Sequence, residues 1–103
     1  MGHCIILVTC PTESDAVKLA SDLVTNKLAA CAQIHPVKSI YTWKKKVHHD
    51  PEFRLIIKTK GALYKEAETF ICNQHGYEVP QIVRVPIEDG LKSYLDWIDE
   101  STT

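Results

Sequence analysis

The sequence lacks a strong excess of charge of either sign. Its 103 residues include 12 Lys and Arg against 13 Asp and Glu, which gives a formal net charge of -1. Nucleic-acid binding requires a clustered excess of Lys and Arg, and the one basic run, at residues 44–46, is too short to provide it. Because short lysine runs usually lie in solvent, we interpret this run as an exposed hairpin tip and expect no nucleic-acid partner.

Long apolar runs are also missing. No stretch approaches the ~20 consecutive apolar residues that a membrane-spanning helix needs. The apolar segment at residues 4–8 is short and has no basic residues before it, so it does not have the pattern of a secretory signal. The sequence therefore predicts a cytoplasmic protein with no membrane partner.

The four cysteines form no C-x-x-C pair, so a zinc ribbon and a thioredoxin-type site are not expected. Cys4, Cys31 and Cys72 lie in apolar segments, where a reduced thiol behaves as a small hydrophobe. Cys10 stands between a predicted strand and a predicted helix. A helix N-terminus lowers the pKa of a thiol and favours the metal-binding thiolate, which makes Cys10 a candidate soft ligand for copper. A partly buried, inert thiol is the alternative.

Recognisable catalytic patterns are absent as well. The chain has four glycines but no Gly-rich phosphate loop, and no nucleophile–base pair or pair of carboxylates can be recognised. An acyl, glycosyl or phosphoryl transferase is therefore not supported. We predict that the protein is not an enzyme.

The chain has the size and balance of one globular domain, which we assign to residues 1–103. Hydrophobic residues make up 45% of the sequence and charged residues 24%, which suits a single core. Thr12 is placed to cap the first helix, with Glu13 in its first turn, and Gly76 suits a turn with positive φ. The apolar spacing indicates strands at residues 5–9, 29–47, 52–60 and 81–86, a turn at 48–51, and helices near 12–26, 63–73 and 91–98.

This order is β-α-β-β-α-β-α. Without its last helix it is the split β-α-β arrangement of the ferredoxin-like α+β fold, in which two helices cover one face of a four-stranded antiparallel sheet. The two middle strands exceed the usual ~5–6 residues, so they form a long hairpin that projects beyond a small sheet. Exposed strand edges pair readily with other chains, and we therefore predict an oligomer.

Five segments carry a family resemblance. They are KLAAC at residues 27–31, SIYTW at 39–43, IKT at 57–59, HGYEVPQI at 75–82, and the group Gly90, Tyr94, Leu95 and Trp97. In their order and separations the chain resembles the CutA family of divalent-cation tolerance proteins over most of its length. Lys45 stands where the family usually has a glycine two residues after the hairpin tryptophan, and Gln81 stands where it often has a glutamate after Val-Pro.

The resemblance implies a ferredoxin-like subunit that forms a homotrimer similar to the PII signalling proteins. It also implies a non-catalytic role in tolerance to divalent cations, with copper bound by some members. The inter-subunit cleft of the family would here be lined by Tyr41, Trp43, Glu52, Lys58, Tyr77, Glu78 and Trp97. Interface packing is the alternative role for the aromatic residues, and a cross-strand salt bridge is the alternative for Glu52 and Lys58.

For copper, the bacterial members use a Cys near the end of the first strand and two adjacent His after the second helix. The matching positions here are Val8, Gln74 and His75, so His75 is the one ligand that is retained. Because divalent first-row metals favour imidazole donors, we predict His75 as a metal ligand, with Cys10 as the second candidate. A helix C-terminal residue that bonds the last carbonyl groups is the alternative role for His75.

Two functions from different classes follow. The first is a trimeric metal-tolerance protein, for which copper is the expected cation. The second is a PII-like sensor or scaffold that binds a small ligand or a partner protein in clefts between subunits. The cluster at residues 48–50 is a weaker metal candidate, because adjacent residues of a strand point to opposite faces.

Overall fold

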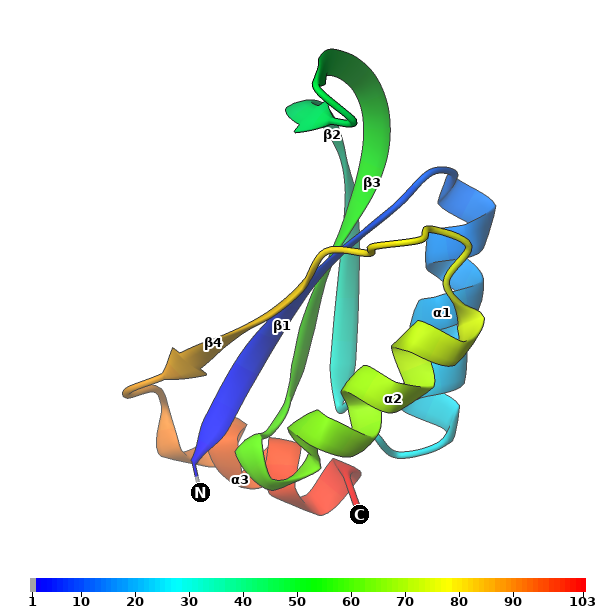
Figure 1. The fold of residues 1–103 in the computed structure, drawn as a ribbon. Coiled ribbons are helices and arrows are strands. Elements are labelled where there is room, and N and C mark those ends of the chain that lie inside the picture. The colour runs from blue at the N-terminus through cyan, green and yellow to red at the C-terminus, as the bar shows by residue number, and fades with distance from the viewer. Residues whose placement is uncertain (1) are drawn as a thin grey trace.

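The computed structural model describes residues 2–103 and has an α+β architecture. Among these residues no helix is long and apolar enough to cross a membrane. The elements follow the predicted order (Figure 1). They are β1 (His3–Cys10), α1 (Glu13–Thr25), β2 (Cys31–Trp43), β3 (Lys46–Lys60), the short 3₁₀ helix η1 (Gly61–Leu63), α2 (Tyr64–Gln74), β4 (Ile82–Ile87) and α3 (Lys92–Ser101).

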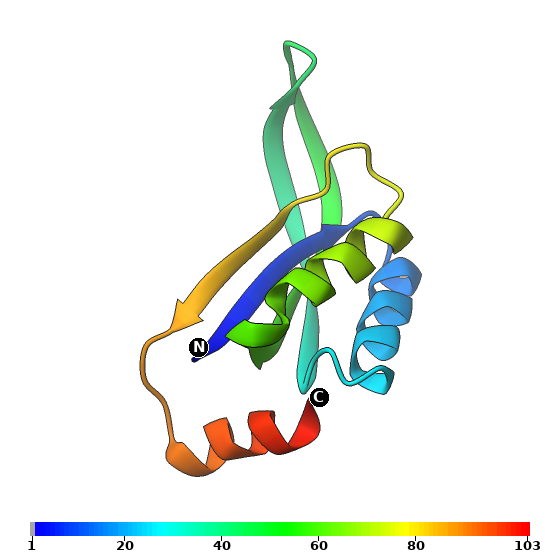
Figure 2. The ribbon, with the colours of Figure 1, turned by 60° about the horizontal axis from the view of Figure 1, so that its bottom comes forward.

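The four strands form one sheet in the order β2-β3-β1-β4, and all neighbouring strands are antiparallel. Helices α1 and α2 cover one face of this sheet, whereas α3 lies across the end where β1 begins (Figure 2). There His3 Nε2 donates a hydrogen bond to Asp99 of α3 at 2.9 Å. The arrangement confirms the predicted ferredoxin-like order with an added C-terminal helix.

The core lies between the sheet and the two helices. Alternate residues of the central strands, Ile6 and Val8 of β1 with Leu55 and Ile57 of β3, are fully buried, as the period of two along a strand requires. They pack against the apolar stripes of α1 and α2. Thr59 is also fully buried, and its hydroxyl donates to the Leu28 carbonyl oxygen at 2.7 Å, which fixes the loop after α1 to the sheet.

The first helix begins and ends where the sequence predicts. The Thr12 hydroxyl accepts a hydrogen bond from the Asp15 amide at 3.1 Å, and Asn26 is the C-cap. The prediction for Gly76 is wrong, because no glycine among residues 2–103 has a positive φ. The left-handed conformation is adopted instead by Lys27, which follows the C-cap, and by two residues of the hairpin.

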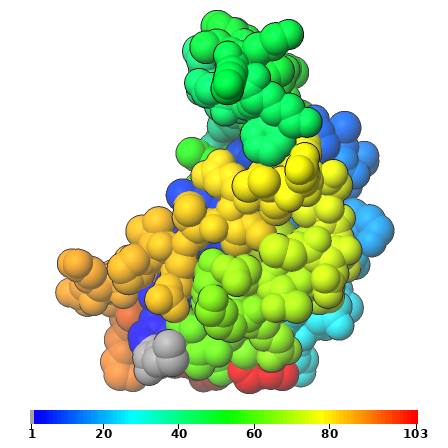
Figure 3. Space-filling view, in the orientation of Figure 1, coloured from blue at the N-terminus to red at the C-terminus, as the bar shows by residue number. Residues whose placement is uncertain are grey.

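The long hairpin turns at Lys44 and Lys45, which have φ values of 52° and 66°. Positive φ at both central residues is typical of a type I′ turn, which matches the twist of the flanking strands. The turn predicted at residues 48–51 is therefore wrong, since these residues lie inside β3. The tip of the hairpin projects beyond the rest of the molecule (Figure 3).

The sheet face opposite α1 and α2 is only partly covered. Ile5 and Leu7 of β1 point to this face, with Ile56 of β3 and Val83 and Val85 of β4 in register beside them. The two β4 valines are 45% and 43% exposed. Helix α3 covers only one end of this face, so an apolar surface and the outer edges of β2 and β4 remain open among the described residues.

The four cysteines are all free. Cys4 is buried in β1 as a small apolar side chain, as predicted, and Cys31 is half-buried. Cys72 is exposed, so its assignment to the apolar stripe of the second helix is wrong. The stripe passes instead through Ala67 and Ile71, which are fully buried.

Candidate functional site

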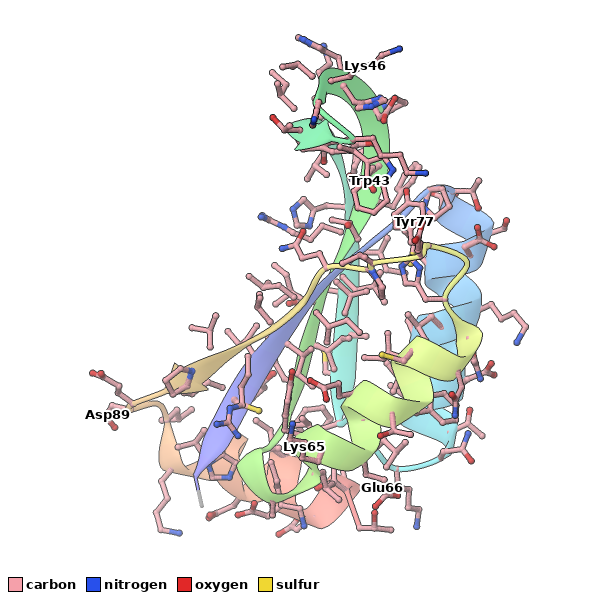
Figure 4. The ribbon with its side chains drawn as sticks, in the orientation of Figure 1. Trp43, Lys46, Lys65, Glu66, Tyr77 and Asp89 are labelled. Atoms are coloured by element: carbon pink, nitrogen blue, oxygen red, sulfur yellow. The ribbon has the colours of Figure 1, made fainter. Side chains whose placement is uncertain are left out.

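A groove lies between the long hairpin and the segment that connects α2 to β4. Its volume is about 650 Å³. Figure 4 shows the side chains of Trp43, from the hairpin, and Tyr77, from the connecting segment, close together at this place. The lining residues are Thr9, Ser39, Ile40, Tyr41, Trp43, Glu52, Gly76, Tyr77, Glu78, Val79, Pro80 and Gln81.

Strand pairing explains the hairpin wall of the groove. Tyr41 is paired with His48, and Val37 with Glu52. Because side chains alternate between the two faces of a strand, Tyr41, Trp43 and Glu52 project to the same side of the hairpin. The Tyr41 ring stacks on the His48 ring at a centroid distance of 5.4 Å, and its hydroxyl donates to a carboxylate oxygen of Asp50.

Glu52 forms the buried part of the groove. It is only 8% exposed, and its Oε2 atom accepts a hydrogen bond from the Tyr77 hydroxyl at 2.8 Å. Burial, together with this bond to a carboxylate, raises the pKa of Tyr77 far above its ordinary value. The bond to Asp50 likewise raises the pKa of Tyr41. Both phenols therefore stay neutral at physiological pH and act as hydrogen-bond donors.

His75 fixes the connecting segment to the end of β1. Its Nε2 atom lies 2.7 Å from the Thr9 carbonyl oxygen, to which it donates, and its Nδ1 atom accepts from the Tyr77 amide at 3.1 Å. The ring is therefore a neutral imidazole protonated on Nε2. It also packs on the Tyr77 ring at a centroid distance of 4.7 Å. Both ring nitrogens thus have partners in the backbone.

A second, smaller pocket of about 370 Å³ lies next to His75. Burial, together with the nearby carboxylates of Asp15 and Glu52, raises the pKa of Cys10 to about 11. The expected lowering by the helix N-terminus is therefore wrong, and the thiol is protonated at neutral pH. The pocket is lined by Cys10, Pro11, Asp15, Lys18, Leu19, Gln74, His75 and Gly76.

Metal coordination was predicted at His75 and Cys10. The two residues line the same pocket, but in this conformation His75 has no free nitrogen and Cys10 is not a thiolate. Within residues 2–103 no group of three or more His, Cys, Asp or Glu is placed to hold a metal ion. A metal on His75 would have to displace one of its two backbone partners, and the ligand assignment stays a prediction.

The residues predicted to line one cleft fall into two groups within the chain. Tyr41, Trp43, Glu52, Tyr77 and Glu78 all line the groove. The other two residues lie elsewhere: Trp97 belongs to α3, and Lys58 of β3 lies next to that helix. There the Lys58 ammonium is 5.9 Å from the centre of the Tyr94 ring, and that ring is 5.5 Å from the Trp97 ring.

The alternative role predicted for Glu52 and Lys58 is a salt bridge between neighbouring strands. Both residues lie on β3, so this cross-strand pair is wrong. The Lys58 ammonium instead donates to Gln33 Oε1 on β2 at 2.6 Å.

Among the residues that were not assigned to this groove from the sequence are Thr9, which lines it, and Asp50, which accepts a hydrogen bond from Tyr41. Thr9 lies at the end of β1, and no local pattern distinguishes it. Asp50 could have been found from the strand register: with a two-residue turn at Lys44 and Lys45, residues 39 and 50 are paired and lie on the same side as Tyr41. The incorrect turn position hid this relation.

Comparisons with known proteins identify the relatives of this chain. Residues 4–101 match the family model described as CutA1 divalent ion tolerance protein. The divalent-cation tolerance protein CutA of Archaeoglobus fulgidus is 40% identical over 99 residues, which are 96% of this chain and 97% of that protein. The chloroplastic CutA of Arabidopsis thaliana is 39% identical over 95% of this chain, which spans 54% of the length of that relative.

Solved structures of related proteins have the same fold over almost the whole chain. The structure of the A. fulgidus protein, described as periplasmic, superimposes with a TM-score of 0.94 and covers 96% of this chain and 97% of that one. The CutA1 structure from Thermus thermophilus gives a TM-score of 0.95 at 38% identity, covering 98% of this chain and 99% of that one. The chain belongs to the CutA1 family of divalent ion tolerance proteins.

Proposed function

We propose that this chain is a non-catalytic divalent-cation tolerance protein and that copper is its preferred metal. The observation that supports the proposal is the family match over residues 4–101 together with the names of the full-length archaeal and bacterial relatives. Copper follows from coordination chemistry, since Cu²⁺ binds nitrogen and sulfur donors more tightly than the other divalent first-row metals.

The pocket beside His75 is the site that we propose for the metal. Cys10, Asp15 and His75 supply sulfur, oxygen and nitrogen donors to its lining. Binding would require the loss of the Cys10 proton and the release of one His75 nitrogen from Thr9 or Tyr77. Metal affinity should therefore fall as the pH is lowered, because protons compete for both donors.

The test is a calorimetric titration of copper and zinc into chelator-treated protein and its variants. We expect saturable copper binding that is tighter than zinc binding and is lost in His75→Ala and weakened at least tenfold in Cys10→Ser. His49→Ala is the matched control, since His49 is exposed on the hairpin and its loss should leave binding unchanged. Weak copper binding that survives both substitutions would reject the site.

We further propose that the protein acts as a homotrimer in the cytoplasm. The open apolar sheet face and the free edges of β2 and β4 support self-association, and the number three comes from the resemblance to the family. The A. fulgidus relative is described as periplasmic, so fractionation of the source cells tests the compartment. Recovery of the protein outside the cytoplasmic fraction would overturn the proposed cytoplasmic location.

A second function is favoured by a separate observation. The groove at the hairpin is larger than the pocket beside His75 and contains neither Cys10 nor His75. It combines three aromatic rings with two carboxylates, which suits recognition of a ligand rather than simple packing. We therefore also propose that the protein is a PII-like sensor or scaffold that binds a small molecule or a partner in this groove.

A further inference from the structure

We infer that the groove binds an organic cation, a compact alkylammonium group with an apolar body. This inference rests on the second proposed function and gives its ligand a chemical class. The argument comes from the charge of the lining residues, from the three aromatic rings and from the acceptor that Glu52 leaves free.

The charge of the groove is negative. Two carboxylates, Glu52 and Glu78, belong to its lining, and no Lys, Arg or His does. Glu52 is almost entirely buried, and the only hydrogen bond of its side chain within residues 2–103 is the one that Oε2 accepts from Tyr77. The second oxygen, Oε1, therefore remains an acceptor for a positively charged ligand. A buried carboxylate gains much from such a partner, because burial without one is costly.

The rings of Tyr41, Trp43 and Tyr77 supply the other half of the site. Aromatic faces attract ammonium groups, and several rings around one cation are the usual means of recognising alkylated amines. This chain gives an internal example, since the Lys44 ammonium lies 5.9 Å from the centre of the Trp43 ring. A ligand ammonium would replace or join this contact, while Val79 offers apolar surface to its body.

A divalent metal ion fits this groove less well. A metal needs several donor atoms with lone pairs at short distance, but no group of three His, Cys, Asp or Glu is so placed in the described part of the chain. Aromatic rings provide no such lone pairs. The same rings favour a cation with a hydrophobic shell, whose charge is spread over alkyl groups.

The experiment is a titration with choline and with 3,3-dimethylbutan-1-ol, the neutral molecule of the same shape, followed by NMR of the two tryptophan indole N–H signals. Choline should move the Trp43 signal, because Trp43 lines the groove. We expect the dissociation constant for choline to be at least tenfold lower than that for the alcohol. Glu52→Gln, which keeps an acceptor for Tyr77, should weaken choline binding about tenfold and leave alcohol binding unchanged.

A second variant tests the role of charge at Lys44, which contacts the Trp43 ring but is not part of the groove lining. Lys44→Gln removes the cation that competes for the Trp43 ring and should tighten choline binding. Equal affinity for choline and the alcohol at Trp43 would overturn the organic cation but keep the groove as a binding site. No movement of Trp43 with either probe would overturn both. Neither result bears on the copper titration, which reports on the other pocket.

Discussion

Cys10 illustrates how burial decides the chemistry of a single side chain. From its place before a helix, the sequence predicts a reactive thiol, because a helix N-terminus stabilises a thiolate. In the fold the sulfur is almost completely enclosed and two carboxylates add to the effect of burial, which raises the pKa of the thiol to about 11. The position of Cys10 before a helix can be recognised from the local sequence. The burial of its sulfur cannot, because it depends on how the chain folds.

This shift predicts a pH dependence of stability. Below about pH 9, the ordinary thiol pKa of 9.0, Cys10 is protonated in both the folded and unfolded states. As the pH rises towards 11, the unfolded state loses this proton more readily, so the contribution of Cys10 to the free energy of unfolding is lost. Urea denaturation at pH 8 and pH 10.5 should show a smaller fall for Cys10→Ala than for the unchanged protein.

Cys72→Ala is the control for this comparison, because its thiol is exposed. It should keep the full fall in stability between the two pH values. If Cys10→Ala also keeps the full fall, burial of the thiol does not contribute to the alkaline loss of stability.

At the scale of elements, the hairpin turn departs most from what sequence reasoning could find. Lys44 and Lys45 both have positive φ, a conformation that Gly and Asn adopt readily and lysine does not. Residues 48–51, with Asp and Pro, have the composition of a turn but lie within β3. From Lys46 to Glu52 this strand has only β2 as a neighbour, so one of its sides is unpaired, which is where strands tolerate proline.

A glycine in the hairpin turn should stabilise the fold. Lys45→Gly should raise the free energy of unfolding by about 0.5–1 kcal/mol, because a residue with a Cβ in the left-handed region costs about 1–2 kcal/mol and the flexibility of unfolded glycine offsets part of the gain. Urea denaturation measures the change. Lys46→Gly, which alters the first residue of β3, should be destabilising, and a loss of stability in both variants would contradict the strain at the turn.

The other elements follow local rules and were predicted well. The stripe on α1, its Thr12 cap and the alternation in β1 and β3 are set by residues close together in sequence. The groove depends on register and on the path of the segment after α2, which local patterns do not contain. Five of its residues were nevertheless named from the family resemblance, and their assignment to a cleft between subunits stays a prediction.

At the scale of the whole molecule, the folded chain is elongated, with extents of 44 × 25 × 22 Å. Much of this length is the hairpin, whose tip packs on no other helix or strand among residues 2–103 (Figure 1). An isolated two-stranded hairpin is only marginally stable in water. Together with the open sheet face, this supports the proposal that other copies of the chain hold the hairpin in place.

Assembly can be tested on the open face. Val83→Arg introduces a charge at a position that is 45% exposed in the subunit, so the fold should tolerate it while the trimer dissociates. Light scattering should give the mass of three 11.7 kDa chains for the unchanged protein and of one for the variant. Thermal stability of the unchanged protein should rise with its concentration.

Val24→Arg is the matched control, because Val24 is 40% exposed on α1, on the covered side of the sheet. It should remain trimeric. A single-chain mass for the unchanged protein at micromolar concentration would contradict assembly altogether.

The two hydrogen bonds of the His75 ring join the two pockets. A metal ion that took Nδ1 would free the Tyr77 amide, and Tyr77 belongs to the wall of the groove. An occupant of the groove that holds Tyr77 in place would equally keep that nitrogen from the metal. Thermodynamic linkage makes the two effects equal in size. A change in metal concentration would therefore change the affinity of the groove for its ligand.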